Sequence, residues 1–169
     1  MLRRRIPLAI ALSGDGAKAP TELRLFAAGW IDTTKGMYLF DQEAADQVMK
    51  AAAEWGNRYS FDYQHSVIDD KVKPEDKKGA GSFLLELRAT PAGPELWAID
   101  IQWAGGVAEA IERQEWLYVS PLFYYDESTR RINELINVAL TNDPATKNMS
   151  PLMAATRLAA LGMSHEQIR

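Results

Sequence analysis

The chain has 169 residues, 47% of them hydrophobic, which suits one domain with a sizeable core. Its 19 basic and 23 acidic residues give a formal net charge of −4 without a basic stripe, so nucleic acid is not an expected partner. Cysteine is absent and histidine occurs twice, which excludes disulfides and cysteine-bound zinc and argues against a histidine-rich metal site.

Two strands and a helix are expected first. Aromatic and branched residues cluster in LRLFAAGWI (23–31) and GMYLF (36–40), on either side of the turn DTTK, which is typical of paired strands. The segment DQEAADQVMKAAAEWG (41–56) is predicted to be a helix, because its apolar residues recur on one face. Asp41 can cap its start and Gly56 can end it.

A third strand, NRYSFDYQH (57–65), follows the helix. Alternation along this strand would place Tyr59, Phe61, Tyr63 and His65 on one face, so the imidazole is expected to end an aromatic row. The charged stretch DDKVKPEDKKGAG (69–81) contains one proline and two glycines and is expected to be a surface loop.

The second half of the chain indicates two hairpins and a short helix. SFLLELRAT (82–90) and ELWAIDIQW (95–103) flank the turn PAGP, and GGVAEAIERQE (105–115) is predicted to be helical. WLYVSPLFYYD (116–126) and RINELINVALT (131–141) form the second pair. The expected fold class is therefore mainly β with flanking helices (α+β), built on a closed or strongly curved antiparallel sheet.

Residues 1–149 are expected to form this domain, and 150–169 a helical tail that begins at Ser150 with a proline in its first turn. The tail ends in SHEQ, which has the form of a capping box without a following helix, so we expect the chain to be part of a longer protein. Apolar residues of the tail fit either packing on the domain or a homodimer interface. No apolar run approaches the roughly 18 residues needed to span a bilayer, so no membrane association is expected.

A serine activated by imidazole is the nucleophile that this composition allows. His65 is the credible base, since His165 lies in the terminal segment, where a role is not expected. Ser120 stands in an apolar aromatic strand where a hydroxyl needs a partner, and Pro121 after it indicates a sheet edge or a bulge. The residues alone leave a purely structural role open for both. Phosphate-binding, zinc-protease and G-x-S-x-G motifs are absent.

Three segments in order, FDYQHS (61–66), WAGGVAEAIERQEWLYVSPLFYYD (103–126) and INVALTNDPA (136–145), resemble the Mu-like prophage I proteins, the capsid-assembly proteases of Mu-type phages. Those proteins are similar to the prohead proteases of tailed phages and to the herpesvirus assemblins. The resemblance runs from about Phe26 to Ala145. It implies an assemblin-like β-barrel and a serine endopeptidase that needs no cofactor and no metal.

The resemblance also implies roles for single residues. His65 matches the base and Ser120 the nucleophile, and Asn137 occupies the place where relatives carry a histidine or an acidic residue before a V-A-L strand. Asparagine can accept a hydrogen bond from the imidazole N–H, but it cannot stabilise imidazolium by charge. Three residues remain alternatives for the third role: Asp143, Glu134 and Asp62.

The family pattern places the oxyanion donors in the turn after this strand. Pro144 has no N–H, so the backbone of Ala145 or Thr146 is the expected donor.

The resemblance also implies substrates and a location. The expected substrates are the phage scaffold protein and the enzyme's own C-terminal extension, and the capsid precursor is a further expected partner. The expected location is inside the assembling prohead in the host cytoplasm. The alternative function is a non-catalytic capsid-assembly or scaffold-binding module with a decayed protease site. Placement of Ser120 and His65 on distant faces would favour that alternative.

Overall fold

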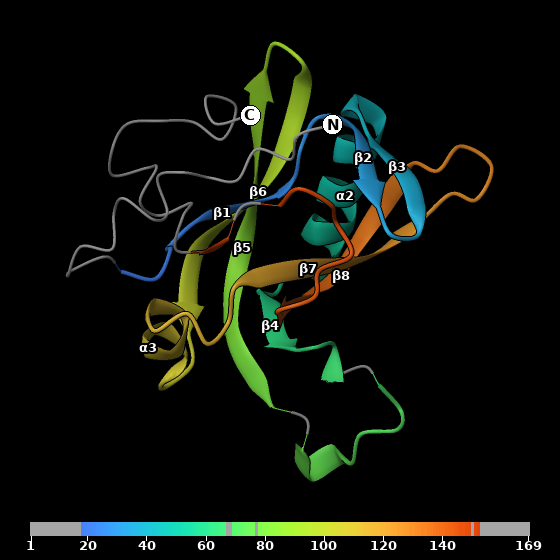
Figure 1. The fold of residues 1–169 in the computed structure, drawn as a ribbon. Coiled ribbons are helices and arrows are strands. Elements are labelled where there is room, and N and C mark those ends of the chain that lie inside the picture. The colour runs from blue at the N-terminus through green and yellow to red at the C-terminus, as the bar shows by residue number, and fades with distance from the viewer. Residues whose placement is uncertain (1–17, 67–68, 77, 150, 153–169) are drawn as a thin grey trace.

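The computed structural model describes residues 18–66, 69–76, 78–149 and 151–152. Within them the fold is mainly β with two α-helices, as the sequence predicted (Figure 1). The strands are β1 (Leu23–Phe26), β2 (Gly29–Thr33), β3 (Gly36–Phe40), β4 (Tyr59–Tyr63), β5 (Gly79–Thr90), β6 (Gly93–Trp103), β7 (Tyr118–Tyr125) and β8 (Ile132–Thr141). The helices are α2 (Gln42–Trp55), α3 (Val107–Glu112) and the 3₁₀ turn η2 (Pro74–Asp76).

Six strands form one sheet in the order β1-β6-β5-β4-β8-β7, and β2 and β3 form a separate two-stranded sheet. The large sheet is strongly curled: β5 and β6 run across β7 and β8 in Figure 1. Its edge strands β1 and β7 do not pair in the described part of the chain, although the rings of Phe26 and Phe123 lie 5.3 Å apart across the opening. The predicted sheet is therefore present in its strongly curved form, and the described strands do not close it into a barrel.

Three details of the predicted strands are wrong. The segment 23–31 is not one strand, because Gly29 has a φ of +89°, a left-handed conformation that favours glycine, and β1 pairs with β6 whereas β2 pairs with β3. The charged segment 69–81 does not stay a loop to its end, since its last three residues begin β5. The sheet is not wholly antiparallel, because β4 runs parallel to β8.

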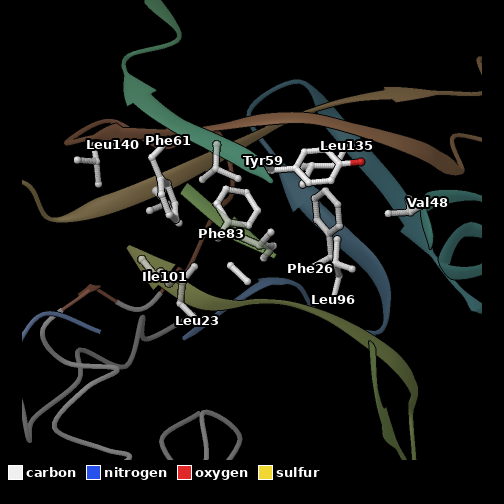
Figure 2. Packing of buried hydrophobic residues seen from close by; sticks show 14 of the residues in the cluster. Leu23, Phe26, Val48, Tyr59, Phe61, Phe83, Leu96, Ile101, Leu135 and Leu140 are labelled. Atoms are coloured by element: carbon white, nitrogen blue, oxygen red, sulfur yellow. The ribbon is translucent and has the colours of Figure 1, made fainter. Parts of the chain in front are cut away.

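The core lies inside the curl of the large sheet, where side chains from strands on its two sides meet (Figure 2). Phe61 and Phe83 are fully buried, with their ring centroids 4.6 Å apart, and the ring centroid of Trp103 also lies 4.6 Å from that of Phe61. On α2, the buried residues are Ala44, Ala45 and Val48. These contacts fix β4, β5 and β6 relative to one another.

Helix α2 has the ends that the sequence predicted. The Asp41 side chain accepts a hydrogen bond from the N–H of Ala44 at 3.0 Å, and Gly56 ends the helix with a φ of +69°. Asp41 also forms an ion pair with Arg131 of β8's leading segment, with an Nη2–Oδ2 distance of 2.9 Å. The cap therefore joins the helix to the sheet.

This ion pair predicts an acid-dependent loss of stability. The hydrogen bond from Arg131 holds the pKa of Asp41 below its ordinary value of 3.8. A carboxyl with a lowered folded pKa stabilises the fold above its unfolded pKa and loses that contribution as the pH falls through its folded pKa. Asp41→Asn keeps a cap acceptor but loses the pair, so at pH 7 it should unfold about 0.5 kcal/mol more easily than the parent. Urea unfolding should show this difference disappearing below pH 3.8; a difference independent of pH would contradict it.

The predicted tail lies, apart from Pro151 and Leu152, outside the described residues, as does His165. Leu152 is buried, and its N–H donates to the carbonyl of Leu117 at 2.8 Å, so the described chain ends beside the start of β7. None of the helices in the described ranges is long and apolar enough to cross a membrane.

Candidate active site

Polar side chains gather on one face of three adjacent strands, β4, β8 and β7. Four of the six buried polar residues in the described part of the chain lie there: Asp62, Ser120, Asn137 and Thr141. The strand register brings them together, because Asp62 of β4 and Ser120 of β7 both lie opposite Ala139 of β8. Alternation then places the side chains at 137, 139 and 141 on this face, while Val138 and Leu140 enter the core. Burial of a polar group costs free energy unless the group forms hydrogen bonds, so a cluster of buried polar side chains indicates a functional site.

Ser120 lies on an edge strand, as the proline after it predicted. β7 is the last strand of the large sheet, and Pro121 pairs with Val138 of β8. Ser120 pairs with Ala139 of β8, and the residue is only 9% exposed. Ala139, which stands opposite it, is fully buried.

His65 does not extend the aromatic row of β4, contrary to the prediction. The strand ends at Tyr63, and Gln64 and His65 have φ values of +50° and +59°. Two bonds hold this turn: the N–H of His65 donates to Asp62 Oδ1 at 3.1 Å, and the N–H of Gln64 donates to the Leu140 carbonyl at 3.0 Å. Successive non-glycine residues with positive φ are costly and gather at functional sites. The turn therefore directs the imidazole to the polar face.

The side chain of Asn137 is hydrogen-bonded to the imidazole of His65. Its Oδ1 lies 3.0 Å from His65 Nδ1, and the residue is 3% exposed. Leu122 pairs with Asn137 but Phe123 pairs with Leu135, so Ile136 is an extra residue that forms a bulge directly before Asn137. An amide oxygen can only accept, so His65 Nδ1 is the donor in this contact.

His65 and Ser120 line the same pocket, which has a volume of about 320 Å³. Its other lining residues are Gln64, Thr141, Asn142 and Asp143. The predicted base and nucleophile therefore line one pocket, and Asn137 is hydrogen-bonded to His65. They do not lie on distant faces, which is the arrangement that would have favoured a decayed site.

The three alternatives for the third role stand elsewhere relative to the imidazole. Asp62 is fully buried, and its Oδ1 accepts the backbone N–H of His65 and thereby holds the turn. Asp143 lines the pocket, where its N–H donates to Thr141 Oγ1 at 3.0 Å. Glu134 is exposed near the opposite end of β8 and is not among the lining residues. Asn137 is the residue whose side chain bonds Nδ1.

The two expected oxyanion donors lie beside β2. Thr34 donates its N–H to the Ala145 carbonyl at 2.9 Å, and Thr146 forms an antiparallel bridge with Thr33. Neither Ala145 nor Thr146 lines the pocket. The structure thus does not bring these two residues to His65 and Ser120.

Three pocket residues were not candidates in the sequence analysis: Gln64, Thr141 and Asn142. Thr141 is the buried one among them. Its signal was present, since the residue follows Asn137 at an even spacing on a predicted strand and so shares its face. Among the described residues, no group of three or more acidic or histidine side chains is placed to hold a metal ion.

Comparison with known proteins places this chain in a sequence family. The family model described as "Mu-like prophage I protein, N-terminal domain" matches residues 23–153, a range that contains His65, Ser120 and Asn137. The chain is 29% identical over 126 residues to Protease I of Escherichia phage Mu, an alignment that covers 73% of this chain and 35% of that protein. The chain thus spans about a third of this curated relative. No solved structure matches the chain.

Proposed function

Because the chain belongs to the Mu-like prophage I protein family, we propose that it carries the active site of a serine endopeptidase of phage capsid maturation. One observation carries this proposal: the His65 imidazole is bonded to Asn137 and shares a pocket with Ser120. The relative in phage Mu is named Protease I, which agrees with a proteolytic role.

The reaction is acyl transfer to Ser120. His65 Nε2 takes the proton of the Ser120 hydroxyl, and the oxygen attacks the carbonyl carbon of a peptide bond to form a tetrahedral intermediate. The imidazolium returns the proton to the leaving amine, and the acyl-enzyme remains. Water, activated by the same imidazole, then hydrolyses the ester and frees Ser120.

Asn137 positions the base in this mechanism. Its Oδ1 accepts the Nδ1 proton of His65 at 3.0 Å, which fixes the tautomer whose Nε2 can act as a base. Asparagine carries no charge, so it stabilises the developing imidazolium through a dipole alone. Asp62 supports the same geometry from the backbone side by holding the turn that carries His65.

The substrates that fit this proposal are the phage scaffold protein and the C-terminal extension of the enzyme itself, with the capsid precursor as a partner. The reaction would take place inside the assembling prohead in the host cytoplasm, and a homodimer formed through the tail is the proposed assembly. Placement of the nucleophile on an edge strand supports a protein substrate, because an extended peptide can lie along an exposed edge.

Labelling with a fluorophosphonate followed by peptide mapping tests the class and the nucleophile together. We expect the label on Ser120, and we expect Ser120→Ala to abolish it while the melting temperature stays the same. Ser60→Ala is the matched control, because Ser60 is an exposed serine on β4, and it should label like the parent. A protein that takes no label at Ser120 would overturn the proposal in favour of the non-catalytic assembly module.

A further inference from the structure

We propose that the side-chain hydroxyl of Thr141 donates a hydrogen bond to the oxyanion of the tetrahedral intermediate. The inference rests on the proposed function, since it needs Ser120 to be the nucleophile. Acyl transfer at a serine requires donors aimed at the developing negative charge, and these donors are often the largest single contribution to catalysis. The two backbone donors expected from the sequence do not line the pocket, so the donor must be sought among the groups that do.

Thr141 lies one diagonal step from the nucleophile on the same face. Ser120 pairs with Ala139, and Thr141 is the next residue of β8 on that face, opposite Tyr118. Diagonal neighbours in an antiparallel pair have Cα atoms roughly 7–8 Å apart, a separation that polar side chains can bridge through a bound group. Ala139 itself is fully buried, and Ser120 and Thr141 on either side of it both line the pocket.

On β8, the residue that holds the base and the proposed oxyanion donor lie on opposite sides of Ala139. Asn137, which holds His65, stands one step before Ala139 on the polar face, and Thr141 stands one step after it. When Ser120 attacks a substrate carbonyl, Asn137, which holds His65, therefore lies toward one end of β8, and the Thr141 hydroxyl lies toward the other. Such a separation is needed, because the oxyanion and the leaving amine lie on different sides of the tetrahedral carbon.

The Thr141 hydroxyl is free to donate. Its oxygen accepts the N–H of Asp143 at 3.0 Å, and its own proton has no acceptor among the described residues. The residue is 7% exposed, so the hydroxyl is held in place and largely shielded from water. A hydroxyl that is oriented by one bond and still has its proton available is preorganised for an incoming oxyanion.

Two substitutions separate this role from packing. Thr141→Val keeps the shape of the side chain and removes the hydroxyl, and Thr141→Ser keeps the hydroxyl. We expect Thr141→Val to lower the rate of fluorophosphonate labelling at Ser120 by about 100-fold, the loss typical of one oxyanion donor. Thr141→Ser should stay within about threefold of the parent, because its hydroxyl can occupy the same place.

Alkylation of His65 by iodoacetamide supplies the readout that a structural role would move. This reaction forms no oxyanion, so Thr141→Val should alkylate His65 at the parental rate. Equal loss of alkylation and of Ser120 labelling would mean that valine disturbs the site, and would overturn the inference. Unchanged labelling of Thr141→Val would also overturn it while leaving the proposed function intact. A parent chain that never labels at Ser120 would overturn both.

Discussion

Replacement of Asn137 by leucine is expected to lower the rate of fluorophosphonate labelling at Ser120 by about 10³-fold or more, without loss of stability. The Oδ1 of Asn137 is the acceptor for His65 Nδ1, and loss of the group that fixes the tautomer of a catalytic histidine costs up to roughly 10⁴-fold in serine proteases. Leucine fills a similar volume but cannot accept a hydrogen bond.

The expected stability of the leucine variant follows from the amide nitrogen of Asn137. Asn137 Nδ2 is buried and has no hydrogen-bond partner in the described part of the chain. An unsatisfied buried donor costs about 1–3 kcal/mol, so an apolar replacement should leave the free energy of unfolding equal or higher. Stability given up at an active site is common where a side chain is kept for chemistry.

Asn137→Asp is the matched control for the leucine variant. A carboxylate still accepts from Nδ1, so this variant should keep the labelling that leucine loses. Labelling rates at one pH, with urea unfolding of both variants, check these expectations. A leucine variant that labels like the parent would remove Asn137 from the site.

Local signals explain which parts of the fold could be predicted. Both ends of helix α2 were predicted because its N-cap, Asp41, and the glycine with positive φ that ends it, Gly56, are recognised from residues next to the helix. The hairpins β5–β6 and β7–β8 were predicted because turn residues separate alternating apolar runs. Each of these features depends on contacts close in sequence.

The geometry of the site depends on contacts distant in sequence, which residue patterns do not report. The parallel pairing of β4 with β8 joins segments more than 70 residues apart, and β8 also holds the turn at Gln64 and His65 through the carbonyl of Leu140. Alternation therefore predicted the wrong face for His65. Asn137 was identified from a family resemblance, and its bulge at Ile136 could not be read from the sequence.

A second large effect is expected in the sheet that supports the site, where Gly81→Ala should destabilise the fold by about 2–4 kcal/mol. Gly81 lies in β5, between Phe61 of β4 and Trp103 of β6. A Cβ atom there would stand 2.6 Å from the carbonyl oxygen of Gln102 and 3.1 Å from the Cα of Trp103. Both are backbone atoms, so the clash can be relieved only by moving the β5–β6 pairing.

Gly79→Ala in the same strand is the control for this substitution. A Cβ at Gly79 would lie 3.9 Å from the carbonyl oxygen of Phe61, an ordinary contact, so this variant should unfold within about 1 kcal/mol of the parent. At roughly 2–4 °C for each kcal/mol, the melting temperatures of the two variants should differ by about 2–16 °C. Because the displaced Trp103 packs on Phe61, four residues before His65, Gly81→Ala should also slow labelling at Ser120. Equal melting temperatures for the two alanine variants would show that β6 can move without cost.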